Sequence, residues 1–258
     1  WDGNAVKRLL KSEALQNTSI SQMIMLTKKH GFKGVNMDFE ELNLETDVLF
    51  NAFMKNLYTQ FHAQNLIVTQ DISPDNEDYN PKILQHYNDY IILMAYDQHT
   101  DLSNAGDISH QEWVEEKLDK ICGEMDANKV ILALACYGYD WPTGHVGKSV
   151  TYDEAIITAS HYKSTINFDR ESANLNYKYT DDNGLPHQVY FTDAATNFNL
   201  IRKADDWNVA GIAIWRLGSE DKRLWQFIST DLTLATLEKK PFDLSKLSIL
   251  KNGVDITY

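Results

Sequence analysis

The chain has 258 residues, enough for one large domain with a sizeable core, and a single α/β barrel often occupies about that length. Its 24 Lys+Arg against 37 Asp+Glu give a net charge of −13, which opposes binding to nucleic acid or to an anionic lipid surface and suits a neutral substrate. Only Cys122 and Cys136 are present, so no disulfide framework is implied and the core must hold the fold. There is no run of about 18 apolar residues and no signal-peptide pattern, so this segment itself is predicted neither to span nor to target a membrane.

Short apolar runs alternate with longer stretches of helical period, which is typical of repeated βα units and a parallel sheet. The expected helices are 5–30, 51–64 and 111–125. In the first of them we expect an N-cap at Thr18 or Ser19 and a stop at Gly31. The predicted strands are Gly34–Phe39, Leu66–Ile72, Tyr90–Tyr96, Lys129–Tyr137 and Val209–Trp215.

Turn-rich sequence precedes the last predicted strand. Tyr177–Tyr179 and Gln188–Phe191 flank a polar turn and are predicted to form a hairpin. We interpret residues 161–192 as an insertion in the same domain, because they have the composition of a hairpin and its loops. Residues 1–240 are therefore predicted to form one catalytic barrel.

The ends of the chain suggest a longer protein. The residues Trp-Asp-Gly-Asn at positions 1–4 are typical of the interior of a chain. After Glu220 a helix is predicted to continue to about Lys239, where Pro241 stops it. Residues 241–258 are predicted to be a linker or the start of a following module.

Polar residues alternate along the first predicted strand. Because strand side chains alternate between faces, Asn36, Asp38 and Glu40 share one face and the apolar residues between them point the other way. Polar groups on a buried strand are costly unless a site uses them. A close Asp and Glu can separate two carboxyl pKa values, so that one is a general acid and the other an ionised stabiliser. The alternative interpretation is a strand that ends in solvated acids at Glu40 and Glu41.

Residues 32–40, Phe-Lys-Gly-Val-Asn-Met-Asp-Phe-Glu, resemble the catalytic strand of glycoside hydrolase family 18, whose usual pattern is Asp-Gly-x-Asp-x-Asp-x-Glu. Three further segments resemble landmarks of that family in the expected order: 94–97, 137–141 and Trp215. Each follows or closes a predicted strand. Four ordered landmarks over residues 32–221 are much more specific than a lone Asp-x-Glu.

The resemblance implies a (β/α)8 barrel and a retaining mechanism in which the 2-acetamido oxygen of the sugar attacks the anomeric carbon. It implies that Glu40 protonates the glycosidic oxygen and later activates water, while Asp38 orients the acetamido group and stabilises its positive charge. It implies that Tyr96 donates a hydrogen bond to the acetamido oxygen. Trp215 would stack on the sugar ring, and Asp97 would bind sugar hydroxyls or support the acid.

Several further residues are candidate sugar contacts. Tyr137, Tyr139 and Trp141 fit loop packing and substrate contact equally well, and Gln70 is placed on the inward face near the end of its strand. Core packing is the alternative for Tyr96 and Trp215. The catalytic candidates are thus Glu40, Asp38 and Tyr96, and the substrate-binding candidates are Asn36, Gln70, Met94, Asp97, Tyr137, Trp141 and Trp215.

No cofactor and no metal are expected. Asn36, Asp38 and Glu40 could serve as oxygen ligands for Mg²⁺ or Ca²⁺, but no phosphate-cradling glycine loop lies near them in the sequence. The eight His residues show no zinc-ligand spacing beside these acids.

Two positions depart from the family pattern. Lys33 replaces the first Asp, and Asn36 replaces the middle Asp. Asn36 can hydrogen-bond Asp38 but cannot take up its proton or charge, so we expect an altered pH profile more than a lost activity. Gly-Val-Asn-x-Asp-Phe-Glu is also the form that resembles the spore-peptidoglycan and deacetylase-linked branches of the family.

The motif belongs on the fourth barrel strand of the family, whereas here it is on the first predicted strand. Three βα units, roughly 90 residues at about 30 per unit, are therefore expected upstream. The alternative is a fold that departs from the closed barrel, because an open sheet exposes two edges. Residues 242–258 resemble the junction in bacterial proteins that fuse this domain to a polysaccharide deacetylase and a membrane glycosyltransferase. That resemblance implies an extracytoplasmic location, secreted or at the cell surface.

The predicted function is hydrolysis of a β-linked N-acetylglucosamine polymer: chitin, peptidoglycan glycan or a bacterial exopolysaccharide. The expected partner is that polysaccharide, with no nucleic acid and no membrane contact by this segment. A non-catalytic, lectin-like sugar-binding module is the alternative. The presence of Glu40, Asp38 and Tyr96 favours the enzyme.

Overall fold

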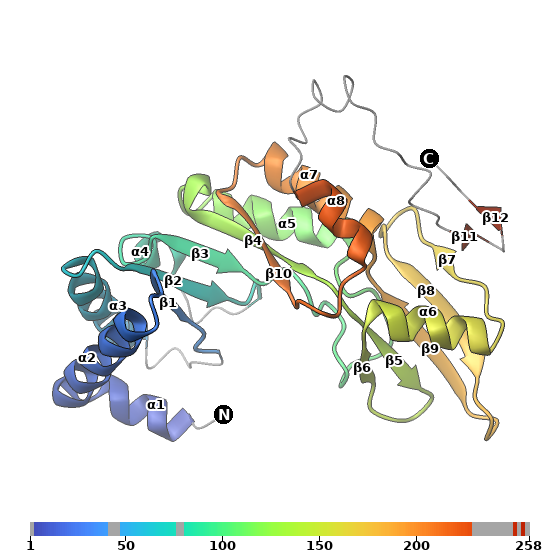
Figure 1. Ribbon diagram of the computed structural model, residues 1–258, viewed down its shortest axis with the longest axis horizontal. Coiled ribbons are helices and arrows are strands. Elements are labelled where there is room, and N and C mark those ends of the chain that lie inside the picture. The colour runs from blue at the N-terminus through green and yellow to red at the C-terminus, as the bar shows by residue number, and fades with distance from the viewer. Residues whose placement is uncertain (1–2, 41–46, 76–79, 229–249, 252–253, 256–258) are drawn as a thin grey trace. The chain divides into compact units, whose positions relative to one another are not determined.

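The computed structural model describes residues 3–40, 47–75, 80–228, 250–251 and 254–255 (Figure 1). The chain divides into two compact units: residues 1–94 and 120–132 form unit 1, and residues 95–119 and 133–258 form unit 2. The division falls inside helix α5 (Gln111–Cys122) and strand β4 (Val130–Ala135). Both elements therefore contribute residues to each unit.

Unit 1 is built around parallel strands. In hydrogen-bonding order these are β1 (Gly34–Met37), β2 (Ile67–Ile72), β3 (Tyr90–Leu93) and the first half of β4. The remaining elements of this unit are α1 (Gly3–Leu10), α2 (Glu13–Lys29), α3 (Asp47–His62), α4 (Pro81–Leu84) and the short 3-10 helix η2 (Ala127–Lys129). Parallel strands joined through helices give the α/β class that the alternating sequence pattern predicts.

Helix α3 buries one apolar face on these strands. It contacts β2, and α2 lies beside it next to β1 (Figure 1). Five side chains of α3 are completely buried: Phe50, Phe53, Met54, Leu57 and Phe61. From the strands, Val68 and Ile91 are equally buried. Each such side chain stabilises the folded state by about 1.5–3 kcal/mol, so this contact is the main support of β1 and β2.

The first helical stretch differs from its prediction. It forms two helices that meet at Ser12, whose side chain accepts the N–H of Leu15 at 3.3 Å. The predicted N-cap at Thr18 or Ser19 is therefore wrong, and the Thr18 hydroxyl donates to a carbonyl one turn back inside α2, at 2.8 Å. Gly31, with a φ of +71°, follows the end of α2 as predicted.

The five predicted parallel strands are all present, and each lies inside its predicted range. Three observed strands end before the predicted ones: β1 ends at Met37, β3 at Leu93 and β4 at Ala135. Asp38, Tyr96 and Tyr137 therefore lie in the segments that follow these strands. The closed eight-stranded barrel with three further βα units stays a prediction.

Unit 2 combines the end of β4 with β10 (Gly211–Trp215) and a separate antiparallel sheet. The N–H of Cys136, just after β4, donates to the carbonyl of Trp215 at 2.7 Å. Cys136 is 1% exposed, and burial raises the pKa of its thiol to about 12. Cys122 in α5 is half-buried, and neither cysteine forms a disulfide.

The antiparallel sheet has the order β6-β5-β9-β8-β7. Its strands are β5 (Gly138–Pro142), β6 (Lys148–Val150), β7 (Asn167–Phe168), β8 (Leu175–Thr180) and β9 (Pro186–Phe191). β8 and β9 confirm the predicted hairpin. Helix α6 (Tyr152–His161) packs on this sheet, and its Ala155 and Ala159 form a cluster with Tyr177 and Phe191. A capping box at Thr151 begins the helix.

The remaining elements of unit 2 are helix α7 (Ala194–Asp206), which precedes β10, and four short elements. The short ones are η3 (Lys222–Leu224), α8 (Trp225–Ile228), β11 (Leu250–Lys251) and β12 (Val254–Asp255), the last two forming an antiparallel pair. The predicted helix as far as Lys239 and its stop at Pro241 lie largely or wholly outside the described residues, as does most of the predicted linker 241–258. Among the helices that are described, none is long and apolar enough to cross a membrane.

The substitution Gly34→Ala is expected to destabilise unit 1. A Cβ at residue 34 would lie 2.1 Å from the carbonyl oxygen of Ile67, its partner on β2. Because that oxygen belongs to the backbone, the strands would have to separate, and overpacking of this kind costs about 1–3 kcal/mol. Chemical denaturation should show a lower midpoint for G34A than for the wild type.

Gly211→Ala is the matched control for this strand glycine. No atom lies within 4 Å of a Cβ built at residue 211, so its unfolding free energy should change by less than about 1 kcal/mol. A midpoint for G34A equal to that of the wild type would show that β1 and β2 can move apart without any loss of unfolding free energy.

Candidate functional site

Asp38 and Glu40 follow the end of β1, and the apolar Phe39 between them packs against a helix. The ring of Phe39 lies 6.0 Å from the ring of Phe53 on α3, in a stacked arrangement. With Phe39 held against the helix, Asn36 and Asp38 are exposed and Glu40 is half-buried. The exposed Asn36 and Asp38 on either side of the buried Met37 agree with the predicted alternation, whereas Glu40 lies beyond the end of the strand.

Asn36 forms hydrogen bonds to strand β2. Its Nδ2 donates to Oδ2 of Asp71 at 2.6 Å, and its Oδ1 accepts the hydroxyl of Thr69 at 2.7 Å. The sequence interpretation paired Asn36 with Asp38, two residues along the same strand. The structure instead uses this amide to connect β1 with β2.

Asp71 is a carboxyl group that the sequence interpretation missed. Burial raises its pKa to about 6, the hydrogen bond from Asn36 lowers it, and the charge of Asp38 raises it. Two acids from neighbouring strands therefore lie on this face. The sequence 67–72 contained a signal for Asp71. The apolar Val68 and Ile72 define the buried face of this strand, so the odd-numbered residues, including Asp71, lie on the opposite face.

Gln70 lies on the buried face of β2, so its predicted inward position is wrong. Its side chain is 0% exposed, and its Oε1 accepts Nδ2 of Asn88 at 3.5 Å. A shift of one residue along a strand moves a side chain to the other face, and the inward position belongs to Asp71. Met94, which follows β3, is half-buried, and its N–H donates to the carbonyl of Ile72 at 3.0 Å.

A second group of predicted residues gathers within unit 2. The hydroxyls of Tyr137 and Tyr139 both donate to Oδ1 of Asp97, the latter at 3.1 Å. Burial raises the pKa of Asp97, and the two tyrosine donors oppose that rise. The ring of Tyr96 meets that of Tyr137 edge to face, with 6.3 Å between centroids.

Two of the aromatic candidates are buried. Tyr137 and Trp141 are each 5% exposed and belong to a cluster with Ile108 and Ala135. Nε1 of Trp141 donates to the carbonyl of Thr100 at 3.1 Å. Of the two interpretations left open by the sequence, burial favours loop packing for Trp141.

Trp215 differs from these buried rings. It is the last residue of β10, and 54% of its surface is exposed. A large exposed ring is costly to leave in water and is suited to stacking on the apolar face of a ligand. This exposure disfavours the interpretation of Trp215 as a core residue.

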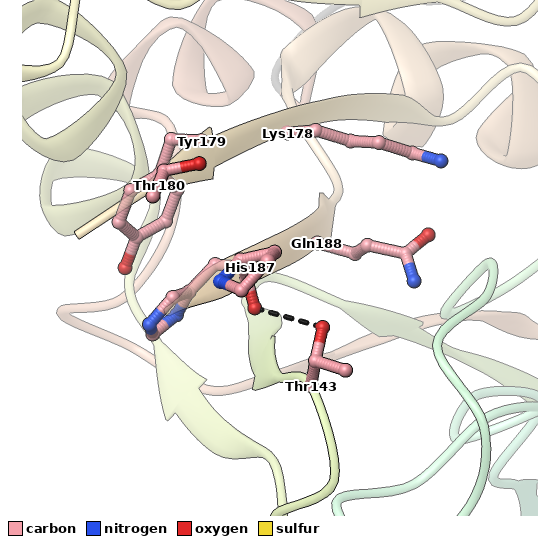
Figure 2. Close-up of a pocket in the computed structure, with 7 residues that line it drawn as sticks. Thr143, Lys178, Tyr179, Thr180, His187 and Gln188 are labelled. Atoms are coloured by element: carbon pink, nitrogen blue, oxygen red, sulfur yellow. Dashed lines mark hydrogen bonds between the residues drawn. The ribbon is translucent and has the colours of Figure 1, made fainter. Parts of the chain in front are cut away.

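A pocket of about 340 Å³ lies at the β8–β9 hairpin, and it is lined by Thr143, Lys178, Tyr179, Thr180, Pro186, His187 and Gln188 (Figure 2). The Thr143 hydroxyl donates to the carbonyl of Pro186 at 2.9 Å. Nearby, Asp140 accepts the Tyr179 hydroxyl at 2.6 Å and lies 2.7 Å from Nδ1 of His187. These bonds join three strands of one sheet and are explained by its packing. Within the described part of the chain, no group of three or more His, Cys, Asp or Glu residues could hold a metal ion.

Comparison with known proteins identifies relatives of the whole region. Residues 2–221 match the family described as "Glycosyl hydrolases family 18". The chain is similar to the Bacillus subtilis glycosylase YvbX, with 25% identity over 239 residues, 88% of this chain and 70% of YvbX. It is also similar to the cortical fragment-lytic enzyme of Bacillus subtilis, with 25% identity over 251 residues. That match covers 91% of this chain and 57% of the enzyme, so the chain spans little more than half of its length.

A solved structure shows the same fold. The Bacillus cereus spore cortex-lytic enzyme SleL superimposes with a TM-score of 0.81 at 23% sequence identity. The match covers 87% of this chain and 55% of SleL.

The substitution Tyr137→Phe is expected to weaken the Asp97 cluster. It removes a buried donor to a buried carboxyl, which costs about 1–3 kcal/mol of unfolding free energy. Loss of that donor should also raise the pKa of Asp97, since the hydrogen bond favours the ionised form. Chemical denaturation and a carbon-13 NMR titration of Asp97 measure the two effects.

Tyr139→Phe, which removes the second donor, and the double variant complete a thermodynamic cycle. An unchanged Asp97 pKa in Y137F would show that the bond from Tyr137 does not hold the carboxylate.

Proposed function

The chain belongs to glycosyl hydrolase family 18, and from that membership we propose that it hydrolyses a polymer of β-linked N-acetylglucosamine with retention of configuration. The observation that carries the proposal is the end of β1. There Phe39 packs against α3 and leaves Asp38 exposed and Glu40 half-buried, and the motif that carries these two acids resembles the catalytic strand of the family.

In the proposed reaction, Glu40 begins protonated and gives its proton to the glycosidic oxygen as that bond breaks. The acetamido oxygen of the sugar attacks the anomeric carbon and forms an oxazolinium ion. Asp38 accepts the acetamide N–H, and its negative charge stabilises the positive charge that develops there. The Glu40 carboxylate then takes a proton from a water molecule as the water oxygen attacks the anomeric carbon. This attack opens the oxazolinium ring, and the proton taken from water leaves Glu40 protonated again.

The family resemblance supplies the remaining proposed roles. Tyr96 would donate a hydrogen bond to the acetamido oxygen, and Trp215, exposed at the end of β10, would stack on the sugar. Asp97, held by two tyrosine hydroxyls, would accept sugar hydroxyls. Met94 and Tyr137 remain proposed sugar contacts.

The proposed substrate is a glycan outside the cytoplasm. The name of the cortical fragment-lytic enzyme indicates action on fragments of spore cortex, which supports peptidoglycan among the three candidate polymers. Chitin and bacterial poly-N-acetylglucosamine share the acetamido group that the mechanism requires. The net charge of −13 is compatible with a neutral glycan and repels strongly anionic ones.

The substitution Glu40→Gln should abolish turnover without weakening binding. Gln keeps the size of the side chain but has no proton to give, and the loss of general acid catalysis typically costs about a hundredfold to ten-thousandfold in rate. The dissociation constant for an N-acetylglucosamine oligomer should change by less than about threefold, because the proton transfer occurs only in the transition state. Steady-state kinetics and calorimetry measure the two quantities.

Glu112→Gln, on the exposed first turn of α5, is the control for removing one negative charge and should keep the wild-type rate. Full activity of E40Q would show that another group is the acid. Binding of oligomers by the wild type without any cleavage would favour the sugar-binding module.

Mass spectrometry of the products released from chitin, peptidoglycan and poly-N-acetylglucosamine should identify the polymer. We expect release from peptidoglycan to be the fastest, with products that carry N-acetylglucosamine at the new reducing end. Faster release from either of the other polymers would assign the substrate to that polymer instead.

A further inference from the structure

One face of the antiparallel sheet in unit 2 carries the pocket at the β8–β9 hairpin. Across the strands β5, β9 and β8, Trp141 pairs with Gln188, and Gln188 pairs with Lys178. The next row on this face, two residues further along each strand, is Thr143, Pro186 and Thr180. Figure 2 shows the side chains of Lys178 and Gln188, which line the pocket, extending in the same direction.

The opposite face of this sheet holds the acid of β5. Asp140 accepts the hydroxyl of Tyr179 at 2.6 Å and lies 2.7 Å from Nδ1 of His187. In the hairpin turn, Asp181 accepts two backbone N–H groups, at 2.9 and 2.8 Å. These two carboxylates are therefore engaged with groups other than Lys178, which lies on the face that carries the pocket.

Lys178 is an exposed cation, and none of the ion pairs between described residues includes it. The half-buried Gln188 beside it has an amide that donates two N–H groups. An ammonium group and an amide next to each other can donate to the two oxygens of one carboxylate, and such charge-assisted hydrogen bonds are the strong ones. In a chain with a net charge of −13, an anionic ligand is repelled overall and needs a local cation of this kind.

We propose that Lys178 and Gln188 bind a carboxylate of the glycan, and that this contact favours peptidoglycan among the three candidate polymers. The proposal rests on the proposed function, which supplies a glycan as the ligand. Peptidoglycan alternates N-acetylglucosamine with N-acetylmuramic acid, an amino sugar whose lactyl group ends in a carboxylate or continues into a peptide that ends in one. Chitin and fully acetylated poly-N-acetylglucosamine contain only neutral sugars, so neither gives Lys178 an anionic partner.

A series of contacts within unit 2 connects Lys178 with the proposed sugar contacts. The Tyr139 hydroxyl donates to Oδ1 of Asp97 at 3.1 Å, and the centroid of the Tyr139 ring lies 5.3 Å from that of the Trp141 ring. Because neighbouring strands are about 5 Å apart, the backbone of Lys178 is about 10 Å from that of Trp141, with Gln188 between them. A disaccharide spans such a distance, so a glycan with one sugar at Asp97 can present the substituent of a neighbouring sugar to Lys178.

The test is a binding experiment, so it does not depend on turnover. Calorimetry on the 258-residue chain carrying Glu40→Gln compares two tetrasaccharides. One is chitotetraose, and the other alternates N-acetylglucosamine with N-acetylmuramic acid and has free lactyl carboxylates. Adding Lys178→Gln should raise the dissociation constant of the acidic tetrasaccharide by about twofold to fivefold, the size of an exposed charge pair, and leave that of chitotetraose unchanged.

Lys148→Gln is the matched control. Lys148 is an exposed cation on β6 of the same sheet, and it pairs with Asp140, so its side chain lies on the opposite face. The variant removes the same charge and should change neither dissociation constant. Gln188→Glu places an acid opposite Lys178 and should weaken binding of the acidic tetrasaccharide alone.

A third ligand separates the two sources of the carboxylate. It carries one alanine coupled to each lactyl group, which moves the carboxylate outward by one residue. A selective loss for either acidic ligand in K178Q supports the proposal, and the larger loss identifies the lactyl group or the peptide as the source.

The outcomes distinguish this proposal from the proposed function. Unchanged binding of both acidic ligands in K178Q, an equal loss for chitotetraose, or no binding of any of the three ligands would overturn the role of Lys178, whatever the wild type cleaves. Failure of the wild type to cleave any of the three polymers would overturn the proposed hydrolysis, and a selective loss in K178Q would still assign the carboxylate site.

Discussion

The packing of Phe39 against α3 determines what the end of β1 can do. Its ring lies against a helix face that also buries Phe50, Phe53 and Leu57, so rotation of β1 about its axis would expose a large apolar surface. With Phe39 held on the helix, Asp38 is exposed and Glu40 is half-buried. The packing that stabilises unit 1 therefore also holds the segment that carries Asp38 and Glu40.

The exposed face of β1 combines acids with a neutral amide. An isolated carboxylate pair on adjacent strands would repel, and Asn36 relieves part of this cost by donating to Asp71. Because Asn36 cannot ionise, it adds a hydrogen bond without adding a third negative charge. In a chain with a net charge of −13, a neutral donor at this position keeps two acids close together without further charge repulsion.

The sequence was sufficient for the strands and for the alternation along β1. Apolar runs such as 67–72 and 130–135 are long enough to mark buried strands, and period two then assigns faces. The same rule fails for Gln70 only because its face was assigned one residue out of register along β2. By contrast, the bond from Asn36 to Asp71 joins residues 35 positions apart, and no local pattern in the sequence reports which strand lies beside β1. The start of α2 at Ser12 was missed because Thr18 and Ser19 look like better caps, yet they lie inside a helix that propagates past them.

The burial of Cys136 has a practical consequence. The thiolate is the form that attacks thiol reagents, and a thiol with a pKa of about 12 that is 1% exposed offers almost no thiolate near neutral pH. Cys122, half-buried at the end of α5, is the other cysteine of the chain. A maleimide reagent should therefore leave Cys136 unmodified in the folded protein, and any label that attaches identifies Cys122.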